Sequence, residues 1–145
     1  MTRPALLDIN VLIALFDPTH VHHDAAHDWF GDNRARRWAT CPLTENAFVG
    51  VLSRPLEGRP GERPAVLSAH LRTLCAAADH VFWNDDVSLL DTSRFDLAAA
   101  PHRQLTDIYL VGLAHAHGAT LATFDRSIPS AAAVGGADVL EVIGA

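Results

Sequence analysis

The chain has 145 residues, of which 49% are hydrophobic and 19% are charged. This length supports one domain over residues 1–145 with a core of its own, and the composition excludes an intrinsically disordered protein. The net charge of −6 is unfavourable for a protein that binds nucleic acid through a broad basic face. No apolar run is long enough to cross a membrane, and the N-terminal segment lacks a signal-peptide pattern, so we expect a cytoplasmic protein.

The elements expected in the first half alternate short apolar runs with helical patterns. Asn10 is expected to cap the first helix and Thr44 the third, and Pro42 is expected to stop the second strand. The segment from Arg54 to Pro64 contains three prolines and two glycines, which indicates a loop. The expected ranges are strands over 6–9 and 37–41, helices over 11–16, 21–31 and 44–53, and a loop over 54–64.

The second half continues the same alternation. The clearest helix covers 105–117 and is expected to stop at Gly118. The other expected ranges are a helix over 65–78, strands over 80–83, 120–124 and 138–142, and a short helix over 87–91. Strands that alternate with helices predict an α/β fold, a three-layer sandwich with a central, mostly parallel sheet.

Four acids are expected at one edge of this sheet, where parallel strands end and helices begin. They are Asp8 and Asp125, each after a strand, and Glu45 and Asp107, each after a threonine (Thr44 and Thr106) that is expected to cap a helix. Taken alone, each acid is also typical of a helix cap or a turn. Together, such carboxylates repel one another unless a cation or shared protons offset their charge. Oxygen ligands favour Mg²⁺ or Mn²⁺, so the sequence predicts a metal-dependent enzyme that acts on phosphate esters.

Four segments carry a family resemblance. They are LLDINVLIAL at 6–15, TENAF at 44–48, TD at 106–107 and TFD at 123–125. In this order and spacing they resemble the PIN-domain ribonucleases, and more narrowly the VapC-type toxins of bacterial toxin–antitoxin pairs. The resemblance covers essentially the whole chain. The chain departs from the family pattern at Ile9, where relatives often have a hydroxyl residue, and at Ile128, where they often have an aromatic one.

The resemblance implies a PIN-like fold and an endoribonuclease that uses one or two Mg²⁺ or Mn²⁺ ions. The residues that match the family's metal-binding acids are Asp8, Glu45, Asp107 and Asp125, with Asn10 and Thr123 as polar neighbours. A metal held by Asp8 and Asp107 would activate a water that attacks the RNA phosphodiester. Glu45 and Asp125 would hold a second ion or orient the water. The implied partners are an RNA substrate, a cognate antitoxin that inhibits the enzyme, and a second copy of the chain in a homodimer.

Two other functions fit part of the pattern. A phosphohydrolase of the haloacid-dehalogenase kind would need a second aspartate where this chain has Asn10. A receiver-like binding module would need a lysine near the sheet edge, and the eleven basic residues here are all arginines. Both alternatives therefore lack a residue that they require.

Three further groups of residues invite a functional interpretation. The histidines at 20, 22, 23 and 27 could bind zinc, although a solvated helix start is the simpler interpretation because no further ligand is indicated. The cluster Arg34, Arg36 and Arg37 is the best candidate for an RNA backbone contact. The helices at 11–16 and 44–52 carry surplus apolar residues that are expected either to form an antitoxin groove or to belong to the core. These residues are Leu12, Leu15, Phe16, Phe48, Val49 and Leu52.

Cys41 and Cys75 are expected to be reduced, buried thiols.

Overall fold

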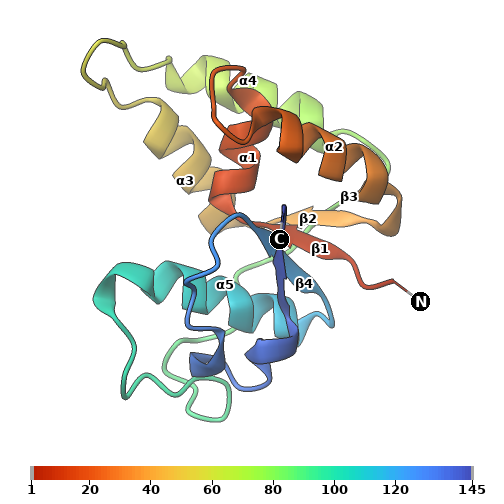
Figure 1. Cartoon of the computed structure of the whole chain (residues 1–145), viewed down its shortest axis with the longest axis vertical. Helices are drawn as coiled ribbons and strands as arrows, with labels where there is room; N and C mark the ends of the chain where they lie inside the picture. The colour runs from red at the N-terminus through yellow and green to blue at the C-terminus, as the bar shows by residue number, and fades with distance from the viewer. Residues whose placement is uncertain (1, 145) are drawn as a thin grey trace.

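A five-stranded parallel sheet forms the centre of the computed structural model, which describes residues 2–144 (Figure 1). The strand order is β3-β2-β1-β4-β5, and every pairing is parallel. The strands are β1 (Ala5–Leu7), β2 (Trp38–Thr40), β3 (His80–Phe82), β4 (Thr120–Thr123) and β5 (Leu140–Val142). Each falls inside or overlaps a predicted strand, and the predicted α/β fold with a central parallel sheet is confirmed.

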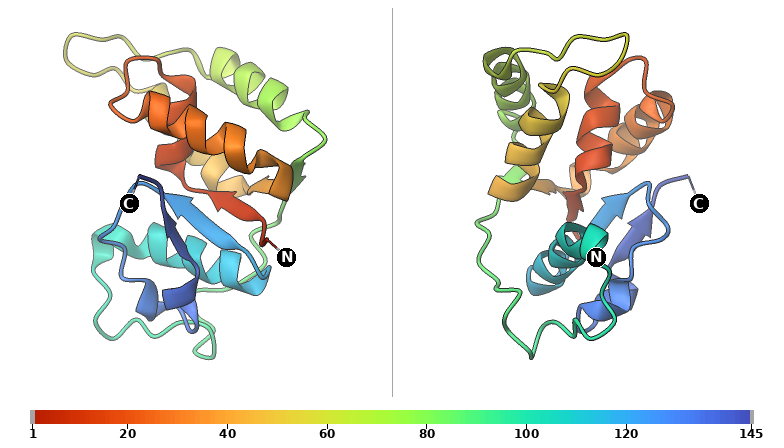
Figure 2. Two further views of the ribbon diagram at one scale, coloured as in Figure 1. Left: turned by 45° about the vertical axis from the view of Figure 1, so that its right-hand side comes forward. Right: turned by 90° about the vertical axis from the view of Figure 1, so that its left-hand side faces the viewer.

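Helices cover both faces of the sheet (Figures 1 and 2). Four pack on one face, and α5 packs on the other beside the irregular segments at 83–104 and 126–139. The helices are α1 (Ile9–Phe16), α2 (His23–Asn33), α3 (Pro42–Leu52), α4 (Pro64–Cys75) and α5 (Leu105–Ala116). Short 3₁₀ turns occupy Arg34–Arg36, His102–Gln104, Ser130–Ala132 and Gly136–Asp138.

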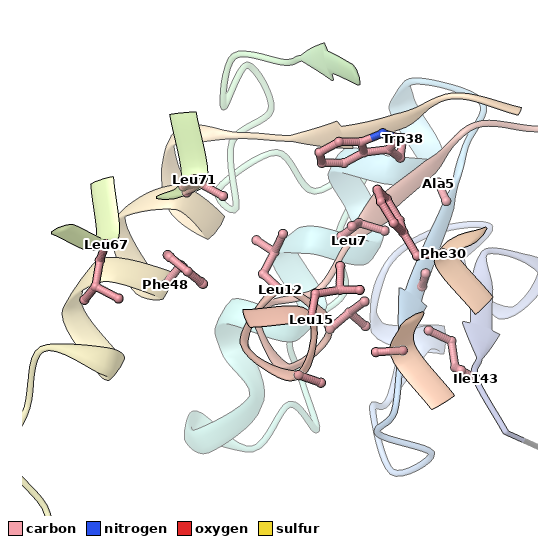
Figure 3. Packing of buried hydrophobic residues seen from close by; sticks show 14 residues of the cluster. Ala5, Leu7, Leu12, Leu15, Phe30, Trp38, Phe48, Leu67, Leu71 and Ile143 are labelled. Carbon is pink, nitrogen blue, oxygen red and sulfur yellow. The ribbon is translucent and has the colours of Figure 1, made fainter. Parts of the chain in front are cut away.

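The sheet divides the apolar core into two clusters, because alternate residues of a strand point to opposite faces. In β1, Ala5 and Leu7 face the helices α1 to α4, whereas Leu6 faces α5. Figure 3 shows the first cluster, in which Leu12 and Leu15 of α1 lie between the sheet and α3. Residues at the carboxyl ends of β1 and β4 are therefore held by packing on both faces.

The residues at the N-cap positions differ from the sequence prediction in three helices. Asp8, not Asn10, caps α1, because the helix begins two residues earlier than expected. Pro42 does not only stop β2: it is the first residue of α3, where its fixed φ and missing N–H are tolerated. Thr44 lies one turn inside α3 and bonds back to the backbone of Cys41. Likewise Gln104 occupies the N-cap position of α5, without a side-chain capping bond, so Thr106 is also inside its helix.

The predicted short helix at 87–91 is absent, and this segment forms turns. Its polar side chains bond locally: Asp91 Oδ1 accepts hydrogen bonds from the backbone N–H and the hydroxyl of Ser93. Such local bonds compete with helix formation. The segment is held to α5 by the Tyr109 hydroxyl, which donates to the carbonyl of Val87 at 3.0 Å.

The loop predicted between α3 and α4 is present, although α4 begins at Pro64. It projects beyond both helices in Figure 1 and returns through an antiparallel bridge between Leu56 and Arg59. Arg59 also forms a salt bridge with Asp17 at the end of α1, with 3.2 Å between Nη2 and Oδ2. Within residues 2–144, none of the helices has the length and apolar character needed to span a bilayer.

Candidate active site

The strand order reverses between β1 and β4, and Asp8 and Asp125 lie at this switch point. The chain moves outward from β1 to β2 and β3, then returns to the other side of β1 with β4 and β5. Asp8 follows β1 directly, and Asp125 follows β4 with one residue, Phe124, between them. Ligands of open α/β sheets bind at such switch points, outside the carboxyl ends of the strands. The fold thus places two of the predicted acids where a substrate is expected.

Asp8 is buried, with 3% of its surface exposed, yet both of its carboxylate oxygens accept hydrogen bonds. The backbone N–H of Ile9 donates to Oδ1 at 2.8 Å, and the Thr123 hydroxyl donates to Oδ2 at 2.7 Å. Burial raises the pKa of Asp8 in spite of these bonds, and the nearby charge of Asp125 adds to the increase. The negative charge of Asp8 is therefore well oriented but poorly compensated.

Asn10 and Thr123 connect Asp8 to Asp125, as their predicted supporting role requires. The Asn10 amide donates to Thr123 Oγ1 at 3.2 Å, and the backbone N–H of Asp125 donates to the same oxygen at 3.0 Å. Asn10 Oδ1 in turn accepts from the backbone N–H of Phe124 at 3.3 Å. A single hydrogen-bond network therefore fixes the ends of β1 and β4 relative to each other.

Asp107 of α5 completes a group of three interacting aspartates. Burial, followed by the charges of Asp8 and Asp125, raises the pKa of Asp107 to about 6. None of the salt bridges within residues 2–144 includes any of the three. The repulsion that the sequence predicted is thus present and is not relieved by a basic side chain.

The raised pKa of Asp107 predicts an unusual pH dependence of stability. Between pH 4 and pH 6 the folded state binds a proton at Asp107 that the unfolded chain, with its ordinary pKa of 3.8, has already released. The free energy of unfolding of the metal-free protein should therefore fall as pH rises through this range. Asp107 should contribute on the order of 2 kcal/mol, after partial screening by solvent.

Urea unfolding in a chelating buffer at pH 4.5 and pH 7 measures this effect. Asp107→Asn should remove most of the Asp107 contribution, so the comparison is between the two proteins at each pH. This comparison is needed because burial lowers the pKa of His80. The lowered pKa of His80 makes the free energy of unfolding rise with pH, which is opposite to the effect of Asp107. Parallel pH profiles for the wild type and the variant would contradict the coupling.

Glu45 makes no hydrogen bond to the three aspartates within residues 2–144. Its Oε2 accepts a hydrogen bond from the Thr40 hydroxyl at 2.9 Å, and Thr40 Oγ1 is also hydrogen-bonded to His80 Nε2 at 2.8 Å. The side chain lines a pocket between α3 and α4 together with Arg72 and Cys75. The site role of Glu45 stays a prediction that requires its side chain to turn away from Thr40.

The other predicted supporting residues do not contact the acids in this structure. Thr44 is buried and bonds only within the first turn of α3, and Thr106 is exposed on α5. Two contacts were missed from the sequence. Thr40 holds Glu45, and Ser127 donates to Asp125 Oδ1 from its N–H at 2.8 Å and from its hydroxyl at 2.6 Å. The contact between Ser127 and Asp125 could have been predicted, because an aspartate followed two positions later by a serine is typical of an Asx turn.

The chemistry of Asp8, Asp107 and Asp125 fits a divalent cation. Uncompensated oxygen donors of this kind suit Mg²⁺ or Mn²⁺ better than zinc. As the side chains lie, however, no group of three or more His, Cys, Asp or Glu in the described residues forms a ready metal site. The aspartates are therefore a donor set that a cation would draw together.

The histidine cluster has a structural role for two of its members. The His23 ring donates from Nδ1 to the carbonyl of Ala14 at 2.7 Å, and the His27 ring donates from Nε2 to the carbonyl of Leu15 at 2.8 Å. These carbonyls lie in the last turn of α1, where they lack partners within the helix. The zinc interpretation finds no support in these contacts.

The arginine cluster is also largely structural. Arg34 binds Asp79 with 2.7 Å between Nε and Oδ2, and Arg36 binds Glu141 with 2.6 Å between Nη2 and Oε1. Both therefore fasten the 3₁₀ turn before β2 to neighbouring segments and are committed to carboxylates. The RNA contact of this cluster stays a prediction, and for Arg34 and Arg36 it would compete with these salt bridges.

Comparison with known proteins identifies the family of this chain. The model of the PIN domain family matches residues 5–134. The chain is 42% identical over 137 residues to Ribonuclease VapC39 of Mycobacterium tuberculosis, covering 94% of this chain and 99% of that protein. It is 41% identical over 136 residues to Ribonuclease VapC44 of the same species, covering 90% of this chain and 92% of that one. The chain belongs to the PIN-domain family, in the group of VapC-type ribonucleases.

A solved structure supports the same fold. The crystal structure of M. tuberculosis VapC20, described as a toxin that cleaves the sarcin–ricin loop, superposes with a TM-score of 0.60. The match covers 90% of this chain and 96% of VapC20, at 16% sequence identity. At this identity the likeness concerns the fold alone. The family predicted from the sequence motifs is therefore confirmed by sequence similarity, and the fold by the structural comparison.

Proposed function

We propose that this protein is a Mg²⁺- or Mn²⁺-dependent endoribonuclease that acts as the toxin of a toxin–antitoxin pair. The observation that carries the proposal is the group of three interacting, uncompensated aspartates at the β1/β4 switch point, in a chain that closely resembles named ribonucleases. A receiver-like module or a haloacid-dehalogenase-like enzyme is less well supported. The Asn10 amide is engaged with Thr123 and Phe124, and no lysine is present.

The side chains of Asp8, Asp107 and Asp125 would hold the ion, and Glu45 would complete the site. When bound, the ion supplies a positive charge that polarises the scissile phosphate and lowers the pKa of a water molecule. The protein's own contribution is orientation: Thr123 and the Ile9 N–H fix both oxygens of Asp8, and Ser127 fixes Asp125. A cysteine nucleophile is disfavoured, because burial raises the pKa of the Cys41 thiol to about 11.

The partners follow from the same proposal. The RNA substrate and a cognate antitoxin are proposed from the VapC names of the relatives, and the cytoplasm is the proposed location because RNA is the substrate. A homodimer is proposed because apolar side chains remain exposed at the end of α3. Val51 is 40% exposed and Leu56 is 62% exposed, and both line one hollow. Light scattering after size exclusion measures the oligomeric state, and a monomer at all concentrations would contradict the dimer.

A direct test compares two substrates. Cleavage of a structured RNA with Mn²⁺, but no release of phosphate from a generic phosphatase substrate, is the expected result. Addition of the small protein encoded beside this gene should suppress the cleavage. Phosphatase activity without RNA cleavage would support the haloacid-dehalogenase-like alternative, and absence of both activities would support the binding module.

Metal binding should be visible in thermal stability. A ligand that binds only the folded state at about a hundred times its Kd adds about 2.7 kcal/mol, which raises Tm by about 5–10 °C in a domain of this size. Mg²⁺ or Mn²⁺ should produce such a shift in the wild type, and Asp107→Asn should reduce it strongly. The matched control is Asp28→Asn, which changes an exposed aspartate on α2. Equal shifts in all three proteins would mean that Asp107 does not belong to a metal site.

A further inference from the structure

His22 is stacked on Phe124, the residue that directly precedes Asp125. The ring centroids are 4.4 Å apart and the ring planes differ by 7°. Phe124 stands between Thr123 and Asp125 in the sequence, and its backbone N–H donates to Asn10 Oδ1. The hydrogen-bond network that orients Asp8 and Asp125 therefore also fixes the backbone that carries the Phe124 ring.

The loop between α1 and α2 holds His22 in this position. Asp17 Oδ1 accepts hydrogen bonds from the N–H and the hydroxyl of Thr19, and the His22 N–H donates to the His20 ring. His20, His23 and His27 all use a ring nitrogen in a hydrogen bond within residues 2–144, whereas the His22 ring uses neither. His22 is exposed. The His22 ring lies 5.7 Å from the tilted His20 ring, and neither of its nitrogens has a hydrogen-bond partner within residues 2–144.

The negative net charge of the protein favours an RNA contact that does not depend on charge, such as stacking. The net charge of −6 opposes electrostatic attraction to RNA, and Arg34 and Arg36 are paired with carboxylates. Stacking of a nucleobase on an aromatic side chain binds single-stranded nucleic acid without depending on the net charge. The rings of His22 and Phe124 are nearly parallel and His22 is exposed, so an RNA base could stack on the His22 ring.

We propose that His22, supported by Phe124, is a stacking platform for one unpaired RNA base next to the scissile phosphate. The proposal rests on the ribonuclease function proposed above and adds a specificity-determining residue to it. It predicts that the enzyme selects bases that are unpaired and stack well, purines above pyrimidines. His22 would contribute to RNA binding and would not hold the ion.

The test measures RNA binding in the Asp8→Asn background, so that cleavage does not interfere. The probes are a fluorescein-labelled 12-nucleotide oligo(A) and the same backbone with abasic riboses. His22→Ala should weaken oligo(A) binding about 5- to 100-fold and should leave abasic binding unchanged. His22→Phe keeps an aromatic ring and should restore the preference for oligo(A). The matched control is His70→Ala, which removes another exposed histidine that packs on a phenylalanine, Phe16, but on α4.

Each alternative outcome has a definite meaning. Equal oligo(A) affinity in the His22→Ala and His70→Ala proteins, while the wild type cleaves RNA, would overturn the platform alone. Failure of His22→Phe to restore binding would show that stacking is not the contribution. Loss of the metal-induced Tm shift in His22→Ala, with Asp8 intact, would show that His22 supports the acids instead. A wild type that neither binds nor cleaves RNA would overturn the proposed function and the platform with it.

Discussion

Asp8→Asn is expected to lower the rate of RNA cleavage by on the order of a thousandfold or more while the protein remains folded. The substitution keeps the shape of the side chain and the oxygen that caps α1, but it removes a charge that the cation needs. Loss of metal-centred charge stabilisation costs several kcal/mol of activation free energy, which corresponds to this change in rate. The fold should survive because a buried, poorly compensated charge is removed, which offsets the weaker contact with Thr123.

Two measurements separate a catalytic loss from a loss of folding. Single-turnover cleavage with Mn²⁺ gives the rate, and urea unfolding of the metal-free protein gives the free energy of unfolding. The control Asp28→Asn carries the same chemical change on the surface of α2 and should cleave RNA at the wild-type rate. Near wild-type cleavage by Asp8→Asn would remove Asp8 from the mechanism.

The positions of the strands and of the three aspartates could be predicted because they depend on local sequence. Short apolar runs flanked by polar residues identify β1 and β4, and an acid directly after such a run must lie at the carboxyl edge of a parallel sheet. Helix starts were less certain. Asp8 and Asn10 are both good caps, and only the packing of α1 against the sheet decides between them.

The environment of Glu45 and of the arginines could not be predicted in this way. The Glu45 contacts depend on Thr40 and His80, and Arg36 pairs with Glu141 from the last strand. Thr40 is only five residues from Glu45, but His80 and Glu141 are distant from their partners in the sequence and meet them only through the tertiary fold. The His22 stack is of the same kind, because it joins the α1–α2 loop to the residue after β4. The sequence indicates which residues can form such contacts, but the partner of each residue is known only from the structure.

The role of the apolar residues of α1 and α3 could also be decided only from the structure. The sequence left open whether they form an antitoxin groove or the core. The structure buries three of them: Phe48 is 2% exposed, Leu12 is 1% exposed and Leu15 is 9% exposed. Phe16, Val49 and Leu52 are partly buried against the same cluster. The core interpretation is therefore correct for Phe48, and a partner that used its side chain would have to open the fold.

Phe48→Ala is expected to lower the free energy of unfolding by about 3–5 kcal/mol. The ring lies edge-on against Phe16 of α1, with centroids 5.7 Å apart, and packs toward Leu67 and Leu71 of α4 (Figure 3). Its loss would leave a cavity at the point where α3 joins α1 to α4, and the lost contacts add to the cost. Because total stabilities are only about 5–15 kcal/mol, the variant should be marginally folded at 37 °C.

Leu90→Ala is the control, since it shortens an apolar side chain that is 88% exposed and lies outside the proposed dimer surface. Its effect should stay within about 0.5 kcal/mol. Urea unfolding of the wild type and both variants, followed by circular dichroism, measures the differences. If Phe48→Ala retained wild-type stability and cleavage but escaped its antitoxin, Phe48 would belong to a partner groove. The burial of its ring between three helices predicts the opposite: cleavage and antitoxin binding should fall together as the folded fraction falls, because both need the helices that this side chain holds in place.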